Sequence, residues 1–115
     1  MLLLWSANLE KGRDLEFKKF VMKNLATYKK RVPPGCTLRG CYGATFNLGP
    51  NDVTWIWEFS KFKDLDSARE FSDPVIDKLS IEEFDFYVPG SANSVILRDV
   101  GEWSVLPPKK QKKSK

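Results

Sequence analysis

Histidine is absent from this chain of 115 residues, and cysteine occurs only twice. Without histidine the chain lacks the usual ligand of haem iron and zinc and the usual general base at neutral pH. Cys36 and Cys41 lie on one expected strand, roughly 17 Å apart at ~3.3 Å per residue, which is too far for a disulfide. We therefore expect no metal site, no cofactor, and a reduced protein located in the cytoplasm.

Long hydrophobic runs are also absent. The apolar stretch Met1–Trp5 is too short for a signal peptide or a membrane helix, so no membrane association is expected. Neither an internal repeat nor a linker divides the chain, which predicts a single domain over residues 1–106. Residues 107–115 form a basic tail with five lysines, which we expect to be disordered.

Excess positive charge is confined to that tail. The formal net charge is +4, but without the five tail lysines 14 basic side chains stand against 15 acidic ones. A nearly neutral body argues against a nucleic-acid partner, because phosphate contacts dominate such binding.

Aromatic residues, in contrast, are concentrated in one segment. In residues 53–60 the side chains alternate strictly, with Val53, Trp55, Trp57 and Phe59 on one side. Alternation with period two among aromatic and β-branched residues predicts a strand. Two tryptophans on one face of a sheet expose much apolar area, which helices, a ligand or a second chain must cover.

Two further segments repeat apolar residues every three or four positions, which predicts helices at 13–31 and 65–79. Asp64 is expected to cap the second helix, and Pro74 to open a new turn within it. Strands are expected at 2–7, 36–48, 53–60 and 94–100, and a short extra strand within 101–106. This order predicts a ferredoxin-like βαββαβ fold of the α+β class, a four-stranded antiparallel sheet with two helices on one face.

The first two strands carry apolar side chains on both faces, although helices cover only one face of such a sheet. Alternation places Leu38 and Tyr42 of the second strand on one face, and Arg39 and Cys41 on the other. A second copy of the sheet, stacked at ~10 Å, would cover the open face. We therefore expect a homodimer, with higher assembly left open.

The segment Glu58–Phe62, the helix opening Asp64–Ala68 and the order of elements together resemble the dimeric α+β barrel superfamily. Its members include antibiotic biosynthesis monooxygenases that need no cofactor, isomerases, stress-responsive barrel proteins and haem-binding enzymes. The resemblance covers residues 1–100 and implies a homodimer with a pocket between sheet and helices. The absence of histidine departs from the haem-binding and histidine-dependent members.

Aromatic strand residues suggest a binding site for a flat, apolar ligand. The candidates are Trp5, Tyr42, Trp55 and Trp57. The alternative interpretation is that these side chains only pack in the core and the dimer interface. The leading functional hypothesis is binding of a small aromatic or apolar metabolite, which extends to its cofactor-free oxidation or isomerisation. A non-catalytic assembly or ligand-sensing module is the second hypothesis.

Polar strand residues are the remaining candidates. Glu58 near apolar groups could act as a base, whereas pairing with Arg39 would make it a simple ion pair. Asn47 resembles the polar strand residues that position substrate in cofactor-free monooxygenases.

RNA-recognition modules share this order of elements, and residues 39–46 echo one of their motifs. The echo lies on the wrong strand and has Cys41 and Gly43 where stacking aromatics belong, so RNA binding is the third hypothesis.

Overall fold

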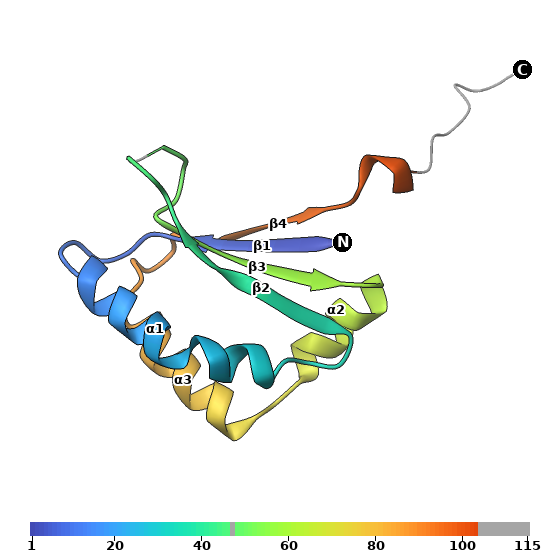
Figure 1. Cartoon of the computed structure of the whole chain (residues 1–115), viewed down its shortest axis with the longest axis horizontal. Coiled ribbons are helices and arrows are strands. Elements are labelled where there is room, and N and C mark those ends of the chain that lie inside the picture. Colours follow the sequence, from blue (N-terminus) through green and yellow to red (C-terminus); the bar gives the residue numbers. More distant parts are fainter. Residues whose placement is uncertain (47, 104–115) are drawn as a thin grey trace, which may run out of the picture.

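The computed structural model of this chain describes residues 1–46 and 48–103. Four strands form one antiparallel sheet in the order β2-β3-β1-β4, and the three α-helices lie on one side of it (Figure 1). The strands are β1 (Leu2–Ala7), β2 (Cys36–Gly43), β3 (Val53–Phe59) and β4 (Asn93–Leu97). The helices are α1 (Asp14–Lys30), α2 (Phe62–Glu70) and α3 (Pro74–Phe84), and a short 3-10 turn, η1, spans Val100–Glu102. The predicted ferredoxin-like α+β fold is confirmed.

The second predicted helix is two helices, α2 and α3. Asp73 ends the extended link between them, and its Oδ1 accepts hydrogen bonds from the amides of Val75 and Ile76 at 2.9 and 3.2 Å. Pro74, which has no amide hydrogen to lose, then opens α3 as the first helical residue. The predicted interruption at Pro74 is present, but this proline starts a separate helix rather than a new turn of the same helix.

The prediction that Asp64 caps α2 is wrong by one turn. The helix begins at Phe62 after Lys61, and Asp64 occupies the third helical position. From there its Oδ2 accepts a hydrogen bond from the Lys61 amide at 3.2 Å. Asp64 therefore still satisfies a free amide at the helix start, from inside the helix.

Two predicted strands are too long. β2 ends at Gly43 rather than Leu48. The Leu48 amide donates a hydrogen bond to the Thr45 carbonyl oxygen at 3.0 Å, so the chain already turns in this segment. β4 ends at Leu97 rather than Val100. The first residues of the expected extra strand form η1 instead, in which the Glu102 amide donates a hydrogen bond to the Asp99 carbonyl oxygen at 2.9 Å. Residues 104–106 and the basic tail lie outside the described residues.

The sheet has a covered face, which the helices overlie, and an open face. Cross-strand register pairs Trp5 with Trp55 on the covered face. The buried core lies under the helices and contains Ala7, Phe17, Tyr28, Leu38, Val53, Trp55, Phe86 and Tyr87. Each large apolar side chain buried there contributes about 1.5–3 kcal/mol to folding. The open face carries Leu2 and Leu4 of β1, Ile56 of β3, and Val95 and Leu97 of β4.

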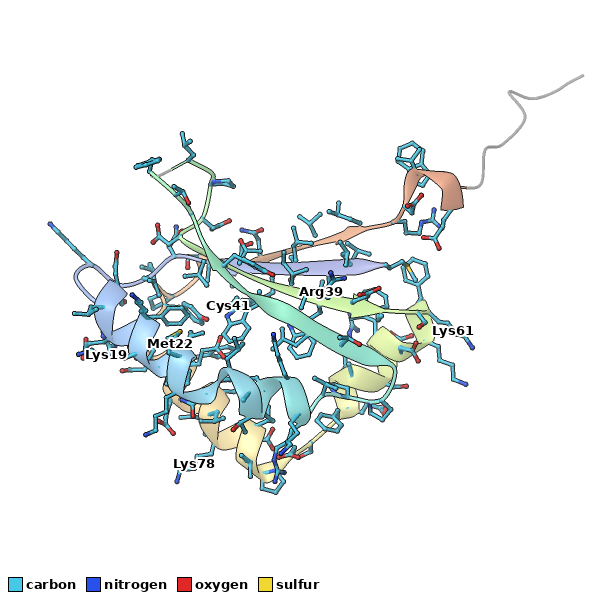
Figure 2. All side chains as sticks on the ribbon, in the orientation of Figure 1. Lys19, Met22, Arg39, Cys41, Lys61 and Lys78 are labelled. Carbon is cyan, nitrogen blue, oxygen red and sulfur yellow. The ribbon has the colours of Figure 1, made fainter. Side chains whose placement is uncertain are left out.

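The outer side of the helix layer is charged. Lys78 projects from α3 away from the sheet (Figure 2). None of the described helices has the length and apolar content needed to cross a membrane.

Candidate functional site

A pocket of about 360 Å³ lies between the covered face and the helices. Its size is within the range of about 300–1,000 Å³ that is common for small-molecule sites. Aromatic side chains from β1 and β3 form one wall, and apolar side chains of α2 and α3 form the other. The lining includes Leu3, Trp5, Trp55, Trp57, Phe59, Leu65, Ala68, Phe71, Ile76 and Phe84.

The pocket exists because α3 stands away from the sheet. Among the described elements, the α3 backbone lies close to α1 and to no strand. Large side chains must bridge this distance, and the Trp5 ring stacks on Phe84 with centroids 5.8 Å apart and an interplanar angle of 8°. The link between α2 and α3, at the opposite end of α3 from Phe84, contributes Phe71 to the lining. The aromatic residues therefore fill the space between α3 and the sheet only partly.

A buried carboxyl group lies on the inner side of this pocket. Glu83, near the end of α3, is only 6% exposed although it is charged in water. Its Oε1 accepts a hydrogen bond from the Tyr28 hydroxyl at 2.9 Å, and its Oε2 accepts one from the Tyr87 hydroxyl. The Tyr87 hydroxyl in turn accepts a hydrogen bond from Trp55 Nε1 at 3.0 Å. Four side chains from α1, β3, α3 and the segment after α3 thus form one buried polar network.

Burial raises the pKa of each titratable group in and beside this network. Desolvation raises the pKa of Glu83, although the hydrogen bonds from Tyr87 and Tyr28 partly lower it. Desolvation and the neighbouring carboxylate also raise the pKa of both tyrosines. Burial raises the pKa of Cys41 to about 12. Burial therefore favours the neutral form of each titratable group in this cluster, Glu83 included.

The outer end of the pocket is polar. Arg31, from the end of α1, lines it together with Asp77 and Ser80 of α3. Arg31 Nη1 lies 3.0 Å from Asp73 Oδ2, so this ion pair ties α1 to the start of α3 beside the opening. The side chains of Arg31 and Asp73 are 45% and 16% exposed, so the pair is partly solvated.

A second hollow of about 360 Å³ lies between α1 and the edge strand β2. Phe17, Val21, Cys41 and Val53 line its base, and Asp14, Lys18 and Asp52 are also at its walls. Among the described residues that line it, no carboxyl group is buried. We therefore treat the tryptophan-lined pocket as the candidate site.

Three of the four predicted aromatic residues lie together. Trp5, Trp55 and Trp57 all line the pocket. Tyr42 does not join them, because it pairs with Thr54 on the open face and is 53% exposed.

Arg39 and Glu58 also lie on the open face, away from the pocket. Arg39 Nη1 contacts Glu58 Oε1 at 2.8 Å, and both side chains are about half exposed. An exposed pair of this kind stabilises a fold by only about 0–1 kcal/mol. Glu58 is thus in the cross-strand ion pair that was the alternative to a catalytic base. Asn47 lies outside the described residues.

A β-bulge explains why Tyr42 and Cys41 are on faces opposite to those predicted. The register of β2 against β3 shifts between Leu38 and Gly40, which adds one residue to the strand. After the bulge Cys41 pairs with Trp55 on the covered face. Figure 2 shows Arg39 and Cys41 on β2. Strict alternation cannot predict such an insertion, although the two glycines of this strand, Gly40 and Gly43, are compatible with one.

Sequence reasoning missed Glu83, Tyr28 and Tyr87. The clearest signal was an acidic and aromatic cluster, with a glutamate four residues before a tyrosine. Glu82 and Asp85 are exposed while Glu83 is buried, and only the placement of α3 decides among these three acids. Among the described residues, no three histidine, cysteine or carboxylate side chains gather as a metal site would require.

Comparisons with known proteins give a fold and no activity. No protein-family model matches the chain, and no curated protein does. The chain is similar to the crystal structure of an uncharacterized NIPSNAP domain protein from Burkholderia xenovorans, with a TM-score of 0.69 and 18% identity over 91% of this chain and 100% of that one. It is also similar to a NIPSNAP family protein with unknown function from Agrobacterium tumefaciens, with a TM-score of 0.66 and 21% identity over 84% of each chain. These likenesses, at such low identity, show that the chain shares the α+β fold of the NIPSNAP structures.

Proposed function

We propose that this protein binds a small, flat, apolar molecule, of the size of one or two aromatic rings, in the tryptophan-lined pocket. The observation that carries the proposal is that Trp5, Trp55 and Trp57 line a single pocket of about 360 Å³. Indole rings offer flat apolar contact area at little entropic cost, and they suit stacking against an aromatic ligand.

We also propose that two copies pair through their open faces, as in the dimeric α+β barrels that the sequence resembles. Val95 and Leu97 are 48% and 45% exposed there, next to the partly exposed Leu2, Leu4 and Ile56. Figure 1 shows the β2–β3 turn and the chain after β4 both rising on this side of the sheet. A second sheet stacked on the open face would cover these apolar side chains, and a self-complementary apolar surface suits a twofold pair.

RNA binding gains no support from the position of the aromatic side chains. RNA-recognition sheets present their stacking rings to solvent. In this chain the three strand tryptophans lie under the helices, and Tyr42 is the one large aromatic of the described strands on the open face.

Filling the pocket tests the binding proposal. Ala68 lies on the pocket side of α2, so Ala68→Phe should occupy the space that the ligand needs. We expect the affinity for naphthol to fall at least ~10-fold, equivalent to ~1.4 kcal/mol. Ser67→Phe adds the same ring on the exposed side of the same helix and should leave the affinity unchanged.

The indole N–H signals in a nuclear magnetic resonance titration provide the measurement. Naphthol should shift the signals of Trp5, Trp55 and Trp57, whereas that of Trp103, which is 56% exposed after β4, should stay in place. Equal shifts at all four tryptophans, or none at the three in the pocket, would contradict the proposal.

A further inference from the structure

We propose that Glu83 is a general base that removes a proton from a carbon atom of the ligand, so that the pocket isomerises a flat carbonyl compound with an acidic C–H bond. This inference rests on the proposed binding function and adds a reaction and a catalytic residue to it. It depends on the position of the carboxyl group, its hydrogen bonds and the chemistry of its neighbours.

The first observation is position. Glu83 is 6% exposed, yet it lines the same pocket as Trp5, Trp55 and Trp57. A ligand stacked on these indoles would therefore lie beside a carboxyl group that water hardly reaches. A carboxylate with few water contacts is a stronger base toward carbon than one in bulk water.

The second observation is orientation. The Tyr28 hydroxyl, from α1, donates a hydrogen bond to Oε1 of Glu83, and the Tyr87 hydroxyl, from the segment after α3, donates one to Oε2. Trp55 Nε1, from β3, donates in turn to the Tyr87 hydroxyl. Three separate elements therefore fix the carboxyl group in one place. Each carboxylate oxygen can accept more than one hydrogen bond, so both retain a lone pair for a proton from the ligand.

The third observation is the absence of a competing base near Glu83 among the described residues. The titratable groups that face it are Tyr28, Tyr87 and Cys41, and Cys36, Arg31 and Asp77 line the rest of the pocket. Burial raises the pKa of both tyrosines and of both cysteines, so these four groups stay protonated near neutral pH. Asp77 and Arg31 are exposed at the outer end of the pocket.

The reaction needs no co-reactant. The Glu83 carboxylate takes the proton from the carbon next to the carbonyl group, and the electron pair of that C–H bond becomes the carbon–carbon double bond of an enolate. The former π pair of the carbonyl moves to its oxygen. When the protonated Glu83 returns the proton to another carbon of the conjugated system, the double bond has moved and the carboxylate is restored.

A nitrobenzisoxazole is a suitable probe, because it is flat and apolar and its ring opens when a base removes one C–H proton. The C–H pair then forms a nitrile, the N–O bond breaks, and a coloured phenolate is released. We expect the wild-type protein to accelerate this opening, and Glu83→Gln to lower the rate about 100-fold, as is typical for loss of a general base. Glu82→Gln, the exposed neighbour on the same helix, should keep the wild-type rate.

Binding of the probe is read separately, from the indole N–H signals of the pocket tryptophans. If the probe shifts these signals in all three proteins but Glu83→Gln keeps the wild-type rate, the inference is overturned while the binding proposal stands. If the probe does not shift the signals of the wild-type protein, the binding proposal fails and the inference fails with it.

A measurement on the wild-type protein covers the case in which Glu83→Gln does not fold. The rate should rise with pH as Glu83 loses its proton, and its midpoint should equal the Glu83 pKa from a carbon-13 titration of the side-chain carboxyl. A rate that is independent of pH, or a midpoint that does not coincide with that titration, would contradict the role of Glu83.

Discussion

Glu83 and its two tyrosine partners decide the chemistry of the pocket at the scale of single residues. A buried carboxyl group without partners would be strongly destabilising, since ionised groups lose their hydration on burial. The two phenol hydroxyls replace part of that hydration, because they donate to the two carboxylate oxygens. The alternative role for such a network is purely structural, namely packing of the core. The rate measurements on Glu83→Gln distinguish that structural role from catalysis.

Tyr28→Phe should raise the Glu83 pKa further. The hydrogen bond from Tyr28 lowers this pKa, so its removal leaves the opposing effect of burial less compensated. The midpoint of the carbon-13 titration of Glu83, and with it the pH profile of probe opening, should move to higher pH. Tyr42→Phe changes a hydroxyl on the open face and should leave the midpoint unchanged. A lower midpoint in Tyr28→Phe would show that the hydrogen bond favours the protonated acid instead.

The loop before β2 and the start of α2 depend on each other at the scale of elements. Gly35 has a φ of +81°, in the left-handed region, and it follows the proline pair in the loop after α1. A Cβ atom at this position would lie 2.5 Å from Asp64 Cγ, the side chain that accepts the hydrogen bond from Lys61 at the start of α2. Glycine is therefore required here for two reasons, backbone conformation and space.

Gly35→Ala should lower the free energy of unfolding by at least ~2 kcal/mol. About 1 kcal/mol comes from the left-handed backbone, and about 1 kcal/mol from displacement of the Asp64 cap. Gly12→Ala is the matched control, since Gly12 has nearly the same φ, +82°, but open space around its Cβ position. Urea denaturation of both variants isolates the contact with Asp64. Equal losses in the two variants would show that this contact costs nothing.

The two faces of the sheet have different roles at the scale of the whole molecule. The covered face carries the pocket and the buried network, and the open face carries the apolar side chains that we propose to form the dimer. The Arg39–Glu58 ion pair also lies on the open face and adds polar character there. Ligand binding and pairing can therefore be changed separately by substitution.

Val95→Lys should weaken the dimer at least ~10-fold and leave the fold intact, because a lysine would be desolvated at the paired open faces. Val95 pairs with Leu4 on the open face and is 48% exposed. Ile96 is its matched control, since it is next in the same strand, is 42% exposed and points to the other face. Sedimentation equilibrium should show a dimer for the wild-type protein and Ile96→Lys, and dissociation for Val95→Lys. A wild-type protein that sediments as a monomer would contradict the proposed pairing.

The sequence alone determined the order of the four strands and the two helical regions, because alternation with period two and repeats of three to four residues are local properties. It also placed Trp55 and Trp57 on one face, and it located the break before Pro74, since proline acts on its own turn. The likeness to NIPSNAP structures agrees with the fold that these patterns predict.

Only the tertiary structure decided what lies around the pocket. The bulge after Leu38 moves Cys41 under the helices and Tyr42 onto the open face, and the two glycines of β2 leave room for it without fixing where it lies. Burial of Glu83 rather than Glu82 depends on which side of α3 faces α1 and the sheet, because successive residues of a helix point about 100° apart. The physical reason is that periodicity assigns side chains to faces within one element, whereas a site requires groups from several elements to meet at one point.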